Sequence, residues 1–368
     1  MNAVEETDQH LTYSGRDEGY RLGYTDGYRI GGCEAIVKHV AEESYSLRNM
    51  KVVYVPQGFD AIDLGVSETL RHLVKVFVKA SADEMLTTVK KEKPDLVLVM
   101  NGLHVFPPTH HDHLDQIRKM GIKTAIWFAD DPYFTDDTAS NALHYDYVFT
   151  HEQNCVAFYQ TQGCSHVYYL PLAMTPLTFH PKRVAPKYVS DVCFIGNAFW
   201  NRVTLFDALA PYLATKKTII AGGHWDRLSS YSLLQDKIVN GWVPIEETAN
   251  YYNGAKIVIN VHRPHEAGSD NRNGRNITGC SINPRTYEIA GCGTLQITDI
   301  RQDLTSYYRP GYDIETFTSP DELQEKIEFY LQHEEERRTI ALRSLKTTRS
   351  KHSYTDRLKR LLEVVRSK

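Results

Sequence analysis

The fold of this chain is constrained most strongly by a regular alternation that begins near residue 51, in which short apolar segments alternate with segments of helical pattern. Such an alternation favours a parallel, doubly wound α/β sheet. Most apolar segments run directly into a polar or glycine-rich turn. The expected strands are 52–55, 96–100, 124–128, 147–150, 192–195, 218–221, 257–261 and 295–298. The expected helices include 67–77, 82–91 and 109–120, with a helical tail of 320–332, 334–349 and 354–366.

At 368 residues the chain is longer than one hydrophobic core usually serves, so two α/β domains in tandem are expected. A proline-rich stretch from 171 to 186 suits a linker, because a residue before proline prefers extended backbone. The sequence therefore predicts two Rossmann-like domains that face a cleft, followed by a helical tail. The predicted divisions are a Gly/Tyr-rich extension of 1–49, an N-terminal domain of 50–180, a C-terminal domain of 181–350 and a C-terminal helix of 351–368.

Composition argues against several other classes of protein. The net charge of −4 gives no basic field for a nucleic-acid partner. No apolar run approaches the ~18 residues of a membrane span. Six cysteines without C-x-x-C spacing, and no signal-peptide pattern, predict a reduced, cytoplasmic setting. The densest histidine group, at 110–113, follows two prolines and is expected to be solvated, so no metal site is predicted.

Polar side chains follow the expected strands, at the edge where open α/β sheets bind ligands. In the N-terminal half Asp130 and Asp131 follow one strand and His151 follows the next. One aspartate could cap the following helix, and the other could accept a proton from a substrate hydroxyl. These three side chains are the candidate catalytic residues.

A second polar group lies in segment 283–299, whose pattern predicts a short helix, a glycine turn and an apolar strand. Pro284 suits the first turn of a helix, where its missing N–H would have no partner. Gly291 and Gly293 suit the helix exit, where a positive φ angle favours glycine. The helix carries one acidic residue, Glu288. An ordinary surface helix with a solvated Glu288 would show the same pattern.

Segment 283–299 resembles the proline, glutamate and glycine segment of GT-B glycosyltransferases, and it is most similar to that of the CgeB-like spore-maturation proteins. The Gly/Tyr-rich start of the chain is similar to the front of such spore proteins as well. Further supporting motifs, which follow the same order along the chain, are 127–132, 169–173, 191–197, 240–244 and 352–357.

This resemblance implies a UDP- or GDP-linked sugar donor held mainly by the C-terminal half, an acceptor held by the N-terminal half, and neither a cofactor nor an obligatory metal. It also implies that Glu288 receives the hydroxyls of the donor ribose, which suits a carboxylate because it can accept two hydrogen bonds from a vicinal diol. Relatives often carry another glutamate eight residues earlier, where this chain has Cys280. The ribose-binding glutamate favours retention of the anomeric configuration, whereas Cys280 departs from that pattern.

A departing diphosphate needs cationic side chains or helix N-termini around it when no metal is used. Arg285 lies three residues before Glu288, so it could contact phosphate or pair with Glu288. Arg202 could contact phosphate or be a solvated first-turn residue. Trp225 and Trp242 are expected in the core rather than stacked on a base. With Glu288, the candidate donor-binding residues are Gly196, Asn197, Arg202, His262, Arg263, Arg275, Asn283, Arg285, Gly293 and Thr294.

Residues 1–49 differ from the rest of the chain. Glycines recur every fourth residue from Gly15 to Gly31, and tyrosines follow three of them, which would place both in a slowly drifting stripe on a helix. Each glycine costs a helix ~1 kcal/mol relative to alanine. The pattern therefore suits either a helix docked on its own or a partner chain, including a homo-oligomer formed through 1–49, or a loosely ordered tail.

Three functions are compatible with these patterns. The main prediction is a glycosyltransferase that acts in the cytosol of a spore-forming cell and decorates a component of the spore surface. The second is a non-catalytic scaffold protein of the spore coat that retains a GT-B fold, suggested by Cys280 and the glycine stripe. The third is a related GT-B enzyme such as a nucleotide-sugar epimerase.

Overall fold

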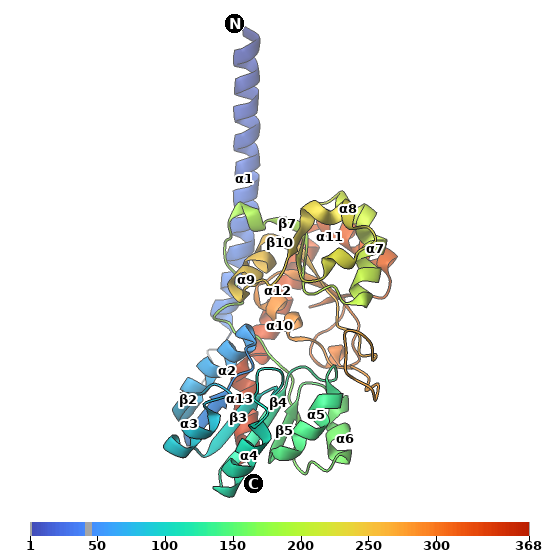
Figure 1. Cartoon of the computed structure of the whole chain (residues 1–368). Helices are drawn as coiled ribbons and strands as arrows, with labels where there is room; N and C mark the ends of the chain where they lie inside the picture. The colour runs from blue at the N-terminus through green and yellow to red at the C-terminus, as the bar shows by residue number, and fades with distance from the viewer. Residues whose placement is uncertain (1, 41–45, 368) are drawn as a thin grey trace.

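The computed structural model describes residues 2–40 and 46–367, and it contains two six-stranded parallel sheets, one above the other in Figure 1. Each sheet has a hydrophobic core on both of its faces. This arrangement confirms the predicted α/β class with two Rossmann-like domains and helices at the C-terminal end of the chain.

The lower, N-terminal sheet has the strand order β2-β1-β3-β4-β5-β6, with every neighbouring pair parallel. Its strands are β1 (Arg48–Val55), β2 (Val74–Lys79), β3 (Leu96–Met100), β4 (Lys123–Phe128), β5 (Tyr147–Thr150) and β6 (Val167–Tyr169). The helices between them are α2 (Asp60–Leu73), α3 (Met85–Glu92), α4 (His110–Lys119), α5 (Thr135–Asn141) and α6 (Asn154–Thr161).

The C-terminal sheet has the order β12-β11-β10-β7-β8-β9 and is also parallel throughout. Its strands are β7 (Ser190–Ile195), β8 (Thr218–Gly222), β9 (Ile238–Asn240), β10 (Ala255–Asn260), β11 (Leu295–Asp299) and β12 (Glu315–Phe317). Its helices are α7 (Trp200–Ala214), α8 (Tyr231–Leu234), α9 (Ile245–Gly254), α10 (Pro284–Gly291), α11 (Pro320–Gln332) and α12 (Glu334–Lys351).

Strand β3 shows why the central strands read as continuous apolar runs. Leu96, Leu98 and Met100 face the core that contains α2, whereas Val97 and Val99 face the core that contains α3 and α4. Because both faces of a parallel sheet are covered by helices, every residue of such a strand is buried. The sequence therefore predicted the bounds of β3 correctly.

The segment 67–77, which we expected as one helix, is divided between two elements. α2 ends at Leu73, and β2 follows at once, with its Phe77 paired to Val52 of β1. Alternating β-branched residues suit β2 as a strand, but the apolar residues of this stretch also satisfy helical spacing, so the prediction was wrong. The three-residue strands β6, β9 and β12 were missed because strands this short show no measurable period; all three lie at sheet edges.

The chain crosses between the two halves twice. Residues 170–189 lead from the N-terminal sheet to the C-terminal one, and α13 (Tyr354–Arg366) returns to the N-terminal half. There Leu358 and Leu362 join the same core as α2 and β3. The guanidinium group of Arg357 anchors this return by donating to the carbonyl of Pro171 at 3.1 Å. The N-terminal core is thus completed by α13.

Helix α1 (Asn2–His39) is one long helix whose first part extends away from both sheets (Figure 1). Its last part lies along α12, where Cys33 is fully buried and Arg338 donates to the carbonyl of Thr25 at 2.8 Å. None of the helices in the described residues is both long and apolar enough to cross a membrane. The glycine stripe is open, because an added Cβ would meet nothing within 4 Å at Gly15, Gly19, Gly23, Gly27 or Gly31.

Candidate active site

A cavity of about 310 Å³ lies between the two sheets, lined by residues that follow strands of both. Residues after β4 and β5 line it from the N-terminal half, and residues after β7, β8, β9 and β10 line it from the C-terminal half. The ligand-binding edges of two doubly wound sheets therefore meet at one cavity. The predicted site residues that line it are Asp130, His151, Gly196, Asn197, Arg202, Arg263, Asn283, Arg285 and Glu288.

Helix α10 begins as the sequence predicted. The side chain of Asn283 accepts the N–H of Thr286 at 3.1 Å, and Pro284 occupies the first turn. Arg285 and Glu288 lie one turn apart and both line the cavity. The side chain of Glu288 is 8% exposed and makes no hydrogen bond or ion pair within the described residues. Burial raises the pKa of Glu288 to about 7, and the positive charge of Arg285 opposes that rise.

Arg202 is not the solvated first-turn residue that the sequence allowed. It is 2% exposed, and its guanidinium group donates to the carbonyls of Val261 at 2.7 Å and Asn197 at 2.8 Å. Burial lowers the pKa of Arg202 to about 9, and the nearby positive charge of Arg285 adds to the effect. Arg202 therefore ties the end of β10 to the turn after β7 and brings a poorly compensated positive charge to the cavity.

The other two arginines at the cavity differ in how they are held. The guanidinium group of Arg263 lies over the rings of Tyr133 and Phe134 in the N-terminal half, 4.6 and 5.1 Å from the ring centres. Arg285 makes no hydrogen bond or ion pair in the part of the chain that the structure describes, so the ion pair with Glu288 that the sequence allowed does not form. Its guanidinium group is thus available to an anion.

The turn after β7 depends on glycine. A Cβ on Gly222 would lie 2.1 Å from the carbonyl oxygen of Gly196, and Gly222 has a φ angle of +144°. Asn197 closes the same turn by accepting the N–H of Gly223 at 3.0 Å. The ends of β7 and β8 can therefore approach closely, and the turn that leads into α7 borders the cavity.

Asp130 and His151 line the cavity from the N-terminal half. The side chain of Asn101 holds Asp130 by donating to its carboxylate at 2.8 Å and accepting its N–H at 3.1 Å. Burial raises the pKa of Asp130, and Arg263 opposes the rise. His151 is 5% exposed, and neither of its ring nitrogens has a well-formed hydrogen bond. Burial lowers the pKa of His151, so its neutral imidazole can accept a proton.

Asp131 does not line the cavity. Its carboxylate is fully buried and accepts hydrogen bonds from Thr150 at 2.6 Å and Tyr159 at 2.8 Å. Burial raises the pKa of Asp131 to about 7. These contacts fix strands β4 and β5 to α6, so we leave Asp131 out of the proposed site.

Four candidate donor-binding residues also lie outside the cavity lining. His262 is buried behind α10, where Nδ1 donates to Asp299 at 2.6 Å and Nε2 accepts the N–H of Asn283. Arg275 is exposed and lies over a ring of α6. Gly293 and Thr294 lie beyond the far end of α10, close to the buried end of α1.

Cys280 faces a carboxylate of the other half and does not line the cavity. Its thiol donates to Oε1 of Glu152 at 2.8 Å. Burial and the charge of Glu152 raise the pKa of Cys280 to about 12. Glu152 is 1% exposed and accepts three backbone N–H groups as well, so it is not free to contact a sugar.

Sequence reasoning missed several lining residues. Trp225 is fully buried as expected, but Trp242 is 76% exposed at the cavity, because it follows Gly241 in the turn after β9. Tyr252 of α9 also lines the cavity, and its buried hydroxyl has no partner. Tyr133 follows a proline after β4, which was the one signal that could have found it.

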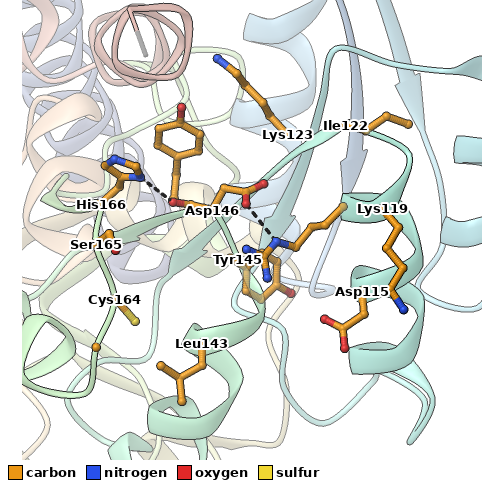
Figure 2. Close-up of a pocket in the computed structure, with 14 residues that line it drawn as sticks. Asp115, Lys119, Ile122, Lys123, Leu143, Tyr145, Asp146, Cys164, Ser165 and His166 are labelled. Atoms are coloured by element: carbon orange, nitrogen blue, oxygen red, sulfur yellow. Dashed lines mark hydrogen bonds and ion pairs between the residues drawn. The ribbon is translucent and has the colours of Figure 1, made fainter.

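A second hollow, of about 770 Å³, lies where strands of the N-terminal sheet begin, at the opposite end of these strands from the cavity (Figure 2). It is lined by the segments that precede β4, β5 and β6. Figure 2 shows the ring of His166 beside Asp146, whose carbonyl it contacts at 3.1 Å. The guanidinium group of Arg118 pairs with the carboxylate of Asp146 at 2.9 Å. Lys123 donates to the carbonyl of Val365 at 2.6 Å.

Comparison with known proteins agrees with this architecture. Residues 202–363 match the family described as "Glycosyl transferase-like". The spore protein CgeB of Bacillus subtilis (strain 168) is 31% identical over 308 residues, which cover 81% of this chain and 93% of CgeB. HepE of Anabaena, solved in complex with UDP, superposes with a TM-score of 0.57 at 11% identity, covering 87% of this chain and all of HepE. A glycosyltransferase from Rickettsia africae ESF-5 gives 0.57 at 13% identity, covering 87% and 98% of the two chains.

The fold is that of the GT-B glycosyltransferase class. Within that class, this chain belongs to the CgeB family.

Proposed function

We propose that this protein transfers a sugar from a nucleotide-sugar donor to an acceptor hydroxyl, with the donor held by the C-terminal half. The observation that carries the proposal is Glu288, a nearly buried carboxylate that borders the cavity and has no partner within the described residues. A buried carboxylate without a partner is costly unless a ligand satisfies it. The vicinal hydroxyls of a ribose would donate to both of its oxygens.

The diphosphate of the donor would be met by the chain's own positive charges. Arg285, Arg263 and Arg202 surround the cavity, and the first turn of α10 borders it. Guanidinium groups and helix N-termini both stabilise phosphate oxygens. HepE was solved with UDP and UDP-glucose, so UDP-linked sugars are the first donors to test, with GDP-linked sugars beside them.

The N-terminal half would hold the acceptor. Asp130 and His151 would bind the acceptor hydroxyl, and the unprotonated ring nitrogen of His151 would take its proton as the bond between the sugar and the departing diphosphate breaks and the new glycosidic bond forms. We propose retention of the anomeric configuration, in keeping with a glutamate at the ribose, and a role in maturation of the spore surface, in keeping with the likeness to CgeB.

The test is a calorimetric titration with UDP, GDP and their sugar conjugates. We expect one class of nucleotide to bind in the micromolar range, and Glu288→Ala to lose that binding. The matched control is Glu246→Ala, which removes an exposed glutamate of α9 in the same half. If no nucleotide binds, or if Glu288→Ala binds as the wild type does, the proposal fails. Product analysis by NMR then reports the anomeric configuration.

A second function, as a scaffold of the spore coat, is favoured by α1. Its first part extends from the body, and Tyr20, Tyr24 and Tyr28 are more than half exposed beside the open glycine stripe. Close packing of a second helix on such a stripe would form a homo-oligomer through residues 1–49. If light scattering gives the same number of chains per assembly before and after removal of residues 2–24, this alternative is contradicted.

A further inference from the structure

The segment 280–283, which leads into α10, is held in place by hydrogen bonds that its backbone N–H groups donate. Four consecutive N–H groups, those of residues 280–283, each donate to a buried side chain at 3.0–3.1 Å. Glu152 accepts from residues 280 and 281, Asp303 from 282 and His262 from 283. A segment anchored at every residue has little freedom to shift, so the position of α10 is set by these three acceptors.

One of the acceptors belongs to the other half of the molecule. His262 and Asp303 follow strands of the C-terminal sheet, whereas Glu152 follows β5 of the N-terminal sheet. Its carboxylate also accepts the thiol of Cys280 at 2.8 Å and the N–H of Asn154 at 3.1 Å, which occupies both oxygens. Glu152 takes part in no ion pair within residues 2–40 and 46–367, so hydrogen-bond donors alone compensate its charge.

The contact joins the two sides of the cavity. Glu152 directly follows His151, which lines the cavity from the N-terminal half, and residues 280–283 directly precede α10, which carries Arg285. The N–H of Gln153 donates to the hydroxyl of Ser281 at 3.0 Å and reinforces the same contact. A shift of this segment would therefore move the donor helix relative to the acceptor side.

We propose that Glu152 is a positioning residue, which fixes the start of α10 against the N-terminal sheet and so sets the place of Arg285 and Glu288 relative to His151. This inference rests on the proposed function, because the position of α10 affects turnover only if α10 holds the donor. Closure of the two halves and alignment of the donor helix are then one event, because the same carboxylate serves both.

The test compares Glu152→Ala and Glu152→Gln with Gln153→Ala, which changes the exposed neighbouring side chain. Two measurements are made on the full-length protein after its folded fraction is checked by thermal unfolding. One is the alkylation rate of Cys280 by iodoacetamide, followed by peptide mass spectrometry. The other is the affinity for UDP, with turnover of UDP-glucose as the kinetic readout.

We expect Glu152→Ala to alkylate Cys280 at least about tenfold faster, since it loses a charge-assisted hydrogen bond, and to lower turnover by a similar factor at 25 °C. Glu152→Gln can rotate its amide to keep one oxygen for the two N–H groups, so it should recover much of the turnover even if Glu152→Ala folds poorly. Gln153→Ala should match the wild type in both measurements.

Wild-type turnover in folded Glu152→Ala and Glu152→Gln overturns the inference, as does an unchanged alkylation rate. These results would leave the proposed function standing. If the wild type binds neither UDP nor GDP, the proposed function fails instead, and the alkylation rate alone still decides whether Glu152 fixes the segment before α10.

Discussion

The two hollows described above differ in how their polar groups are satisfied. The cavity between the sheets measures about 310 Å³ and is bordered by the side chains of Glu288 and Arg285, the ring of His151 and the hydroxyl of Tyr252, none of which makes a well-formed hydrogen bond in the described chain. The hollow where strands of the N-terminal sheet begin is larger, about 770 Å³. Its Asp146 accepts hydrogen bonds on both carboxylate oxygens.

If the proposed function is correct, size is a poor guide to the functional site of this protein. Burying an unpaired polar group costs free energy, so several such groups around one cavity indicate a missing ligand. At the larger hollow Lys123, Asp146 and His166 have partners within the chain, so these groups need no ligand. The predictions below test whether loss of the unpaired groups of the cavity affects function while loss of polar groups at the larger hollow does not.

The largest effect is expected at Glu288. Glu288→Ala should weaken nucleotide or nucleotide-sugar binding between about 100- and 1,000-fold, since two charge-assisted hydrogen bonds to the ribose are lost. Isothermal titration calorimetry measures the change. A loss smaller than about threefold would mean that Glu288 does not contact the ligand.

His151 should affect turnover and not binding. His151→Ala is expected to lower the rate of sugar transfer about 100-fold, the usual contribution of a general base, while the dissociation constant of the donor stays within about twofold. Steady-state kinetics and calorimetry separate the two quantities. Equal losses in both would place His151 on the donor side of the cavity.

Arg285 should distinguish the diphosphate from the ribose. Arg285→Ala is expected to weaken UDP binding about tenfold, by loss of a charge-assisted hydrogen bond, and to leave uridine binding nearly unchanged. Lys119→Ala, at the larger hollow, is the matched cationic control. If uridine loses as much affinity as UDP, Arg285 acts on the ribose or base.

The affinity for nucleotide should depend on pH through Glu288. The ribose hydroxyls donate to the ionised carboxylate, whose pKa in the free protein is about 7. Affinity should therefore rise about tenfold from pH 6 to pH 8 and level off above that range. Glu288→Gln should remove most of this dependence. Fluorescence titration across the pH range measures it.

The raised pKa of Glu288 also predicts how the stability of the folded protein depends on pH, and this dependence is opposite to that of the affinity. Folding raises the pKa of Glu288 from its ordinary value of 4.5 to about 7, so the folded state loses stability as the pH rises between these values. Glu288→Gln avoids that loss and should be more stable than the wild type at pH 8, by on the order of 2–3 kcal/mol. The two proteins should have similar stability near pH 4. Thermal unfolding at both values tests the sign.

The smallest effect is expected at the larger hollow. A double variant, Lys119→Ala with Ser165→Ala, should change neither nucleotide affinity nor sugar transfer by more than about twofold, because neither side chain contacts the cavity between the sheets. A clear loss of activity would show that this hollow also takes part in function.

Much of this architecture could be predicted from the sequence because the central strands are buried on both faces. Strands such as β3 and β5 are continuous apolar runs, so their limits are visible in the sequence. The site was harder to predict, because neighbouring residues on a turn can face opposite ways. Asp130 borders the cavity, whereas Asp131 is enclosed between β4, β5 and α6.

Distance along a helix explains why some other candidate residues do not line the cavity. Asn283 and Gly293 lie at opposite ends of α10, about 15 Å apart at 1.5 Å per residue, so only one end can border the cavity. Contacts between residues far apart in the sequence could not be predicted either. Nothing in the residues around Glu152 indicates that it meets Cys280, 128 positions later.

The return of α13 to the N-terminal half has a consequence for how the protein is made. A ribosome completes β1 to β6 first, but α13, which with α2 covers one face of that sheet, is not synthesised until the whole C-terminal half has been made. Domains often fold in the order of their synthesis. Here the apolar surface that α13 covers stays exposed in the nascent N-terminal half. The final folding step of this half is therefore expected to follow translation of α13.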